Sequence, residues 1–175
     1  KRVIAYANKI VELTNIQRQA HPISKIAVFG AGDIIEGELI FPGQSHLIDS
    51  SLYKQVTLDG PRIMTQFFDI LLANFNEVDV HWVIGNHGHL GGRNRKDYHP
   101  DSNADRMLGS IMSLIYDKEE RIKWTIPDST GDNHWFDIAN LGKKCRFLIW
   151  HGDNVRGFQG FPWYGFGKKL QGWKT

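Results

Sequence analysis

The sequence predicts an α/β fold in which helices alternate with buried strands. Two observations predict it. Several segments carry apolar residues at the spacing of an amphipathic helix, and short apolar runs bounded by turn residues lie between them, as is typical of buried strands. A length of 175 residues suits one domain, residues 1–175, that buries a sizeable core.

The first half of the chain is predicted to form two helix-then-strand units. Apolar spacing predicts a helix over residues 2–19, followed by a buried strand over 25–29. A long connection over 34–60 follows, and a loop of this length is usually functional or contains a short helix. Pro61 is predicted to begin the next helix in its first turn, ahead of a second buried strand over 78–84.

The second half begins with a glycine-rich loop over 85–102. Asn103 or Asp101 is predicted to cap a helix that runs through Tyr116. The predicted inward face of this helix consists of Met107, Leu108, Ile111, Met112 and Ile115.

Three further strands are predicted. Residues 122–126 and 134–138 are predicted to pair antiparallel across the turn between them, and residues 145–150 are predicted to form the third strand that ends at the candidate site. Residues 156–175 contain no acidic residue and show no clear periodicity.

Composition excludes few functions. A net charge of +2 indicates almost nothing about nucleic-acid binding. The single cysteine, Cys145, lies in an apolar strand pattern and cannot form an intrachain disulfide, which favours a reducing compartment. No apolar run approaches the ~18 residues that span a membrane, and no signal peptide is visible, so no membrane association is expected.

Polar residues follow three of the predicted strands. Asp33 follows the glycines after the first strand, Asn86 and His87 follow the second, and His151 follows the third. Strand ends are where active sites collect in layered α/β folds. Oxygen and imidazole donors without thiolate favour a catalytic Mn²⁺, Fe²⁺ or Zn²⁺ over a closed structural zinc site. Two metals about 3.5–4 Å apart are a known arrangement for phosphoryl transfer.

The ordered blocks Gly32-Asp33, Gly85-Asn86-His87 and His151-Gly152-Asp153 resemble the calcineurin-like metallophosphoesterase superfamily. The resemblance implies a two-sheet β-sandwich flanked by helices, an αββα arrangement, with two divalent metal ions. Mn²⁺ is the expected ion, and Fe²⁺ or Zn²⁺ suits the same donors. The superfamily's first block, Asp-x-His, and its last, Gly-His-x-His, are not in the chain, so the domain is expected to be incomplete at both ends.

The resemblance assigns a role to each matched residue. Asp33 resembles the carboxylate that bridges both metals, and His151 resembles a ligand of the second metal. Asn86 resembles a second-metal ligand that also reaches the substrate phosphate, and His87 resembles the catalytic histidine beside the scissile bond. Gly88 departs from the pattern, because many relatives carry Asp or Glu there to support that histidine.

Within the superfamily, the block Gly-Asp-Ile-Ile-Glu-Gly-Glu and the following Gly43-Gln44 are similar to phage and bacterial DNA-repair-type nucleases. This implies hydrolysis of DNA phosphodiesters by a metal-activated water, in the cytoplasm of a bacterium or a phage-infected host cell. Arg93, Arg95 and Lys96 are candidate DNA-phosphate contacts. A homodimer and a repair-ATPase partner are two further hypotheses, and no feature of the sequence itself supports either.

Several alternatives stay open. The first alternative function is a phosphomonoesterase or a small-molecule phosphodiesterase. The second is a non-catalytic nucleic-acid-binding protein with a degenerate metal site. Asp33 alone would suit the cap of a helix over 34–40, and the basic cluster would equally suit a solvated turn. The aromatic residues of 158–166 are predicted to pack rather than to stack on bases. His81 is assigned no functional role.

Overall fold

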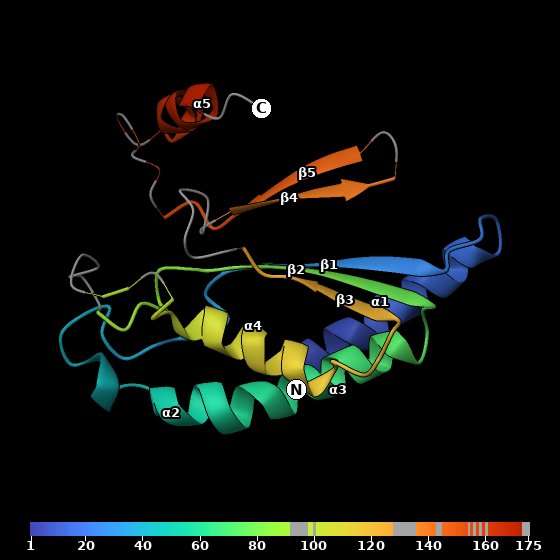
Figure 1. Cartoon of the computed structure of the whole chain (residues 1–175), viewed down its shortest axis with the longest axis horizontal. Coiled ribbons are helices and arrows are strands. Elements are labelled where there is room, and N and C mark those ends of the chain that lie inside the picture. Colours follow the sequence, from blue (N-terminus) through green and yellow to red (C-terminus); the bar gives the residue numbers. More distant parts are fainter. Residues whose placement is uncertain are drawn as a thin grey trace.

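The protein is described here from a computed structural model, shown in Figure 1. The structure describes residues 1–91, 98, 99, 101–127, 136–142, 145–153, 155, 157, 159 and 161–172. Its elements follow in the order α1 (Arg2–Arg18), β1 (Lys25–Ala31), η1 (Gln44–His46), α2 (Leu52–Lys54), η2 (Gln55–Asp59), α3 (Gly60–Leu72), β2 (Glu77–Val83), α4 (Ala104–Ile115), β3 (Ile122–Thr125), β4 (Phe136–Leu141), β5 (Cys145–Trp150) and α5 (Trp163–Gly172).

The larger sheet is parallel, with strand order β1-β2-β3. Parallel neighbours need a crossover connection, and here the crossovers contain α3 between β1 and β2 and α4 between β2 and β3. The register pairs Ala31 with Val83, so β1 and β2 end side by side at one edge. The loops that carry Asp33 and Asn86 therefore leave the sheet at the same place.

Helices and a hairpin cover opposite faces of this sheet. Figure 1 shows α1, α3 and α4 on one side and the antiparallel pair β4–β5 on the other. The hairpin contributes Ala139 and Ile149 to a small buried cluster with Val83 of β2. The described residues thus form a mixed α/β structure with two small sheets, which confirms the predicted fold class at that level.

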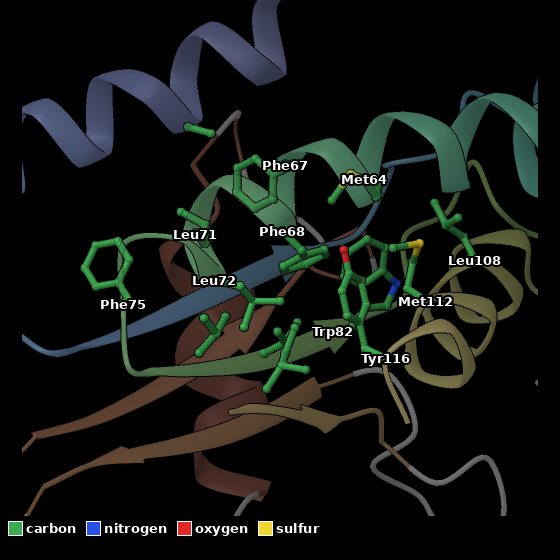
Figure 2. Close-up of a cluster of buried hydrophobic side chains, with 14 of the residues drawn as sticks. Met64, Phe67, Phe68, Leu71, Leu72, Phe75, Trp82, Leu108, Met112 and Tyr116 are labelled. Atoms are coloured by element: carbon green, nitrogen blue, oxygen red, sulfur yellow. The ribbon is translucent and has the colours of Figure 1, made fainter. Parts of the chain in front are cut away.

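The core lies between the helices and the larger sheet (Figure 2). Trp82 fills its centre, where a Cβ atom on Gly30 or on Gly109 would lie 2.7 Å from the Trp82 ring. Only glycine therefore leaves room for the indole between β1 and α4. The buried residues of α3 are Pro61, Met64, Phe67, Phe68, Leu71 and Leu72.

The long connection over 34–60 contains the short helix that its length predicted. It runs through η1 and α2 into η2, a π-helical turn that continues directly into α3. The widened turn has a local cause. Pro61 has no N–H and its ring crowds the carbonyl four residues earlier, which disfavours regular α-helical hydrogen bonding immediately before it.

The predicted pairing of 122–126 with 134–138 is wrong. β3 pairs in parallel with β2, and β4 pairs with β5. The parallel pairing buries Ile122 against the helix layer, an outcome that a local hairpin would not give. Residues 134 and 135 lie outside the described residues.

The residue ranges of the helices were predicted more accurately than the sides on which they bury their residues. α1 and α4 match the predicted ranges to within two residues, with Asn103 as the cap of α4. Met107 and Ile115 were predicted to point inward, but they are 36% and 48% exposed, because α4 buries Asp105 and Arg106 instead. α5 was not predicted. No described helix is long and apolar enough to cross a membrane.

Candidate metal centre

Two turns in close contact position Asp33 and Asn86. Gly32 and Asp33 both have left-handed backbone conformations, with φ of +84° and +54°; Asp is one of the few residues other than glycine that adopts this region. A Cβ atom on Gly32 would lie 2.6 Å from the Gly85 nitrogen, and one on Gly85 would lie 2.1 Å from Asp33 Oδ1. Glycine is therefore required on both sides of the contact.

Asp33 also organises the loop after β2. The His87 backbone N–H donates to Asp33 Oδ1 at 2.9 Å. The His87 ring lies with Nδ1 2.9 Å from the Glu36 carbonyl oxygen and Nε2 3.9 Å from Asp33 Oδ2. Because a carbonyl oxygen only accepts, Nδ1 carries the hydrogen, and Nε2 is the ring atom directed at the Asp33 carboxylate.

His151 joins this group from the second sheet. Its Nδ1 lies 2.9 Å from the Ala31 carbonyl oxygen, so Nδ1 carries a hydrogen. Its Nε2 lies 3.0 Å from both Asp33 Oδ2 and Asn86 Oδ1. In the neutral ring, the Nε2 lone pair faces two oxygen acceptors. A hydrogen on Nε2 that is donated to these oxygens, or a metal ion bound by all three atoms, would satisfy this arrangement.

This arrangement fits one divalent metal ion. The donors are a carboxylate, an amide oxygen and an imidazole nitrogen, a set that suits Mn²⁺, Fe²⁺ or Zn²⁺. Histidines that bind metals usually donate their other ring N–H to a carbonyl or carboxylate, as His151 does to Ala31. Within the described residues, no three His, Cys, Asp or Glu side chains form a metal-binding group. Both metal ions therefore remain predictions.

The support of His87 differs from the pattern of the resembled family. Gly88 has no room for an acidic side chain, because a Cβ atom there would lie 2.6 Å from Asn103 Oδ1. The Glu36 carbonyl orients the ring instead. Glu36 is held in turn by Gln44, a fully buried side chain whose Nε2 donates to the Glu36 carbonyl and carboxylate oxygens, each at 3.1 Å.

Asp105 is a component of the site that the sequence did not reveal. It is fully buried, and its carboxylate accepts backbone hydrogen bonds from Asp33, Ile35 and Gly85 at 2.9–3.0 Å. Burial raises the pKa of Asp105, and these hydrogen bonds oppose the rise. One sequence signal was present: Asp105 lies three and seven residues before Leu108 and Met112, on the apolar face of α4.

Other expectations have mixed outcomes. The alternative in which Asp33 caps a helix over 34–40 is wrong, because no helix forms there. The predicted packing of the aromatic residues after 158 is confirmed for Phe166, whose ring lies 5.2 Å from that of Trp150. Burial is not found for Phe161 and Trp163, which are 65% and 75% exposed. Arg93, Arg95 and Lys96 lie outside the described residues.

His81 fulfils the expectation of a structural histidine. It is 7% exposed on β2, and its Nδ1 lies 2.5 Å from Asp137 Oδ2 on β4. The contact joins the two sheets and so helps to fix the hairpin from which His151 extends.

Comparison of the chain with protein-family models, with curated proteins and with solved structures finds no match in any of the three. The function is therefore argued from the site itself.

Proposed function

We propose that this domain is a metal-dependent phosphodiester hydrolase that acts on DNA. One observation supports the proposal above the others: His151 Nε2, Asp33 Oδ2 and Asn86 Oδ1 converge at 3.0 Å from elements of two different sheets. Buried or half-buried oxygens and nitrogens are normally arranged donor to acceptor. Here one imidazole nitrogen meets a carboxylate oxygen and an amide oxygen from separate strand ends, a donor set that suits a divalent cation.

Each residue has a task that follows from its geometry. Asp33, Asn86 and His151 would hold a divalent ion, which when bound supplies charge neutralisation for a phosphate and lowers the pKa of a bound water. Asn86 directs its Oδ1 to this site, which leaves its Nδ2 as a donor for a phosphate oxygen. His87, whose Nδ1–H donates to the Glu36 carbonyl, would give the leaving oxygen a proton from Nε2 when the ring carries its second proton, and would return to the neutral ring.

The same proposal includes the arrangement of the two sheets relative to each other. We infer that the β1–β3 sheet and the β4–β5 hairpin are parts of one two-sheet sandwich, with the metal ligands at the edge where strands of both sheets end. A second ion, with Asp33 as the shared carboxylate, belongs to this proposal. Mn²⁺ is the ion expected, and Fe²⁺ and Zn²⁺ are the alternatives.

The test measures hydrolysis with Mn²⁺ on two substrates, labelled linear DNA and a simple aryl phosphate. We expect DNA cleavage that Asp33→Asn abolishes and that Asp117→Asn retains. Asn is the appropriate replacement because it preserves the shape of Asp33 and tolerates its φ of +54°; Asp117 is an exposed acidic residue after α4.

The other outcomes are equally informative. Cleavage of the aryl phosphate alone would indicate a phosphomonoesterase or small-molecule phosphodiesterase. DNA binding without cleavage of either substrate would indicate a non-catalytic protein with a degenerate site. Equal activity of the wild type and Asp33→Asn would refute the proposed role of Asp33.

A further inference from the structure

Asp105, at the second position of α4, connects the two turns of the candidate site. Its Oδ2 accepts from the Asp33 N–H at 3.0 Å and from the Gly85 N–H at 2.9 Å. Its Oδ1 accepts from the Ile35 N–H at 3.0 Å. One carboxylate therefore bridges the turn after β1 and the turn after β2.

Core packing does not explain a carboxylate at this position. Asp105 is 0% exposed on the face of α4 that also buries Leu108 and Met112. Burying a charge costs several kcal/mol unless hydrogen bonds satisfy it. An apolar side chain would avoid the cost of the charge but would leave the Asp33, Ile35 and Gly85 N–H groups without this acceptor. The informative property of Asp105 is therefore the set of groups that it joins.

The carboxylate is itself fixed. The Asn103 Oδ1 accepts from the Asp105 N–H at 2.9 Å, while the Asn103 Nδ2 donates to the Gly85 carbonyl at 3.0 Å. The Trp82 indole N–H donates to the Asp105 carbonyl at 2.8 Å. All these groups are buried. Asp105 therefore cannot change its position without breaking several buried hydrogen bonds, each of which leaves a polar group unsatisfied.

We propose that Asp105 is a positioning residue, which sets the spacing and orientation of Asp33 and Asn86 before any ligand binds. The hydrogen bonds that the Asp105 carboxylate accepts come from backbone N–H groups of the two turns, so we infer that it acts through their backbone. The inference that Asp105 raises the affinity for a metal ion rests on the proposed function. The inference that Asp105 holds the two turns in position is independent of the proposed function.

The test uses the whole chain and three variants. Asp105→Ala removes every acceptor. Asp105→Asn retains one side-chain oxygen, which we expect to keep the two bridging bonds to Asp33 and Gly85 and to lose the bond to Ile35. Met112→Ala is the matched control, because it shortens a fully buried side chain of the same helix and removes no hydrogen-bond acceptor of the two turns.

The first readout is amide hydrogen exchange without metal. In Asp105→Ala, we expect exchange at Asp33, Ile35 and Gly85 to be at least about tenfold faster relative to the interior of β2, because these amides lose their buried acceptor. In Asp105→Asn, exchange should be faster at Ile35 only. Met112→Ala should change none of the three selectively. If the turns exchange as in the wild type in both Asp105 variants, the positioning role is overturned; if Asp105→Ala does not fold, Asp105→Asn decides it.

The second readout is the dissociation constant for Mn²⁺. Residues that orient metal ligands without binding the metal themselves typically contribute 10–100-fold to metal affinity. Asp105→Ala should therefore weaken Mn²⁺ binding by about this factor, and Met112→Ala should leave Mn²⁺ affinity unchanged. Equal Mn²⁺ affinity in Asp105→Ala and the wild type would overturn the proposal. Failure of the wild type to bind Mn²⁺ would instead overturn the proposed function, and the exchange result would still decide the role of Asp105.

Discussion

His151 Nε2 lies 3.0 Å from Asp33 Oδ2, although the two residues extend from different sheets. Asp33 follows β1 of the parallel sheet, and His151 follows β5 of the hairpin. The Ala31 carbonyl fixes the His151 ring so that Nε2 faces the carboxylate. The site therefore depends on how the hairpin packs against the sheet as well as on the turns at the strand ends.

Replacement of His151 should weaken metal binding without a comparable effect on folding. We expect His151→Ala to lower Mn²⁺ affinity by more than about tenfold, since even groups outside the ligand set contribute 10–100-fold. Isothermal titration with Mn²⁺ measures the change. His21→Ala, which removes an exposed histidine after α1, is the control and should match the wild type.

Gly85→Ala should disrupt the contact between the two turns. The added Cβ would lie 2.1 Å from Asp33 Oδ1 and 2.3 Å from its nitrogen, so Asp33 must move. We expect a loss of stability of about 1–3 kcal/mol, as for other overpacked sites, together with weaker Mn²⁺ binding. Urea unfolding measures the first effect. Gly167→Ala in α5 meets no atom within 4 Å and should be neutral or slightly stabilising; equal effects of the two variants would contradict the steric argument.

Asp137→Ala should destabilise the packing of the hairpin on the sheet. It leaves His81 Nδ1 buried without its 2.5 Å partner, a loss that typically costs about 1–3 kcal/mol. Asp79→Ala is the comparison, because Asp79 is half-exposed and its Oδ2 lies 3.7 Å from His81 Nε2. We expect urea unfolding at neutral pH to show a clear loss for Asp137→Ala and less than about 0.5 kcal/mol for Asp79→Ala. Similar losses would show that the 2.5 Å contact is not the important one.

Tyr116 should make the protein sensitive to alkali. Burial, followed by the 2.7 Å hydrogen bond to Asp69, raises the pKa of Tyr116 above its ordinary value of 10.0. Above pH 10 the unfolded chain releases this proton first, so the free energy of unfolding should fall by up to about 1.4 kcal/mol per pH unit.

The variant Tyr116→Phe isolates this effect. It should be less stable at neutral pH by about 1 kcal/mol, because the hydrogen bonds to Asp69 and Thr65 are lost. Its stability should decline less steeply above pH 10. Urea unfolding at a series of alkaline pH values measures both slopes, and identical slopes would contradict the assigned pKa direction.

Local sequence patterns were sufficient for the parts of the site that depend on strand ends. Glycine followed by Asp33, and Gly85 followed by Asn86, each come directly after an apolar run. Parallel neighbours end at the same edge, so these side chains had to lie close together. The position of His151 was predicted from the same rule, although its strand belongs to the other sheet.

The patterns were insufficient where long-range packing decides the outcome. β3 joins β2 rather than the next segment of chain, because that pairing completes the face under α4. An Asp in the first turn of a helix usually lies at the surface and interacts with the helix dipole. Asp105 is buried instead, because the turns that contain Asp33 and Gly85 pack against it and donate hydrogen bonds to its carboxylate. The missing periodicity of 156–175 likewise concealed α5.

The most direct test of the account is a Mn²⁺ titration of the wild type, Asp33→Asn and Asp117→Asn. Electron paramagnetic resonance measures the concentration of free Mn²⁺ at each point of the titration. The account predicts saturable binding to the wild type and to Asp117→Asn, and an affinity more than about tenfold lower for Asp33→Asn, whose amide supplies no negative charge to the site. Binding of Mn²⁺ to Asp33→Asn with the affinity of the wild type would contradict the account, as would a wild type that binds no Mn²⁺.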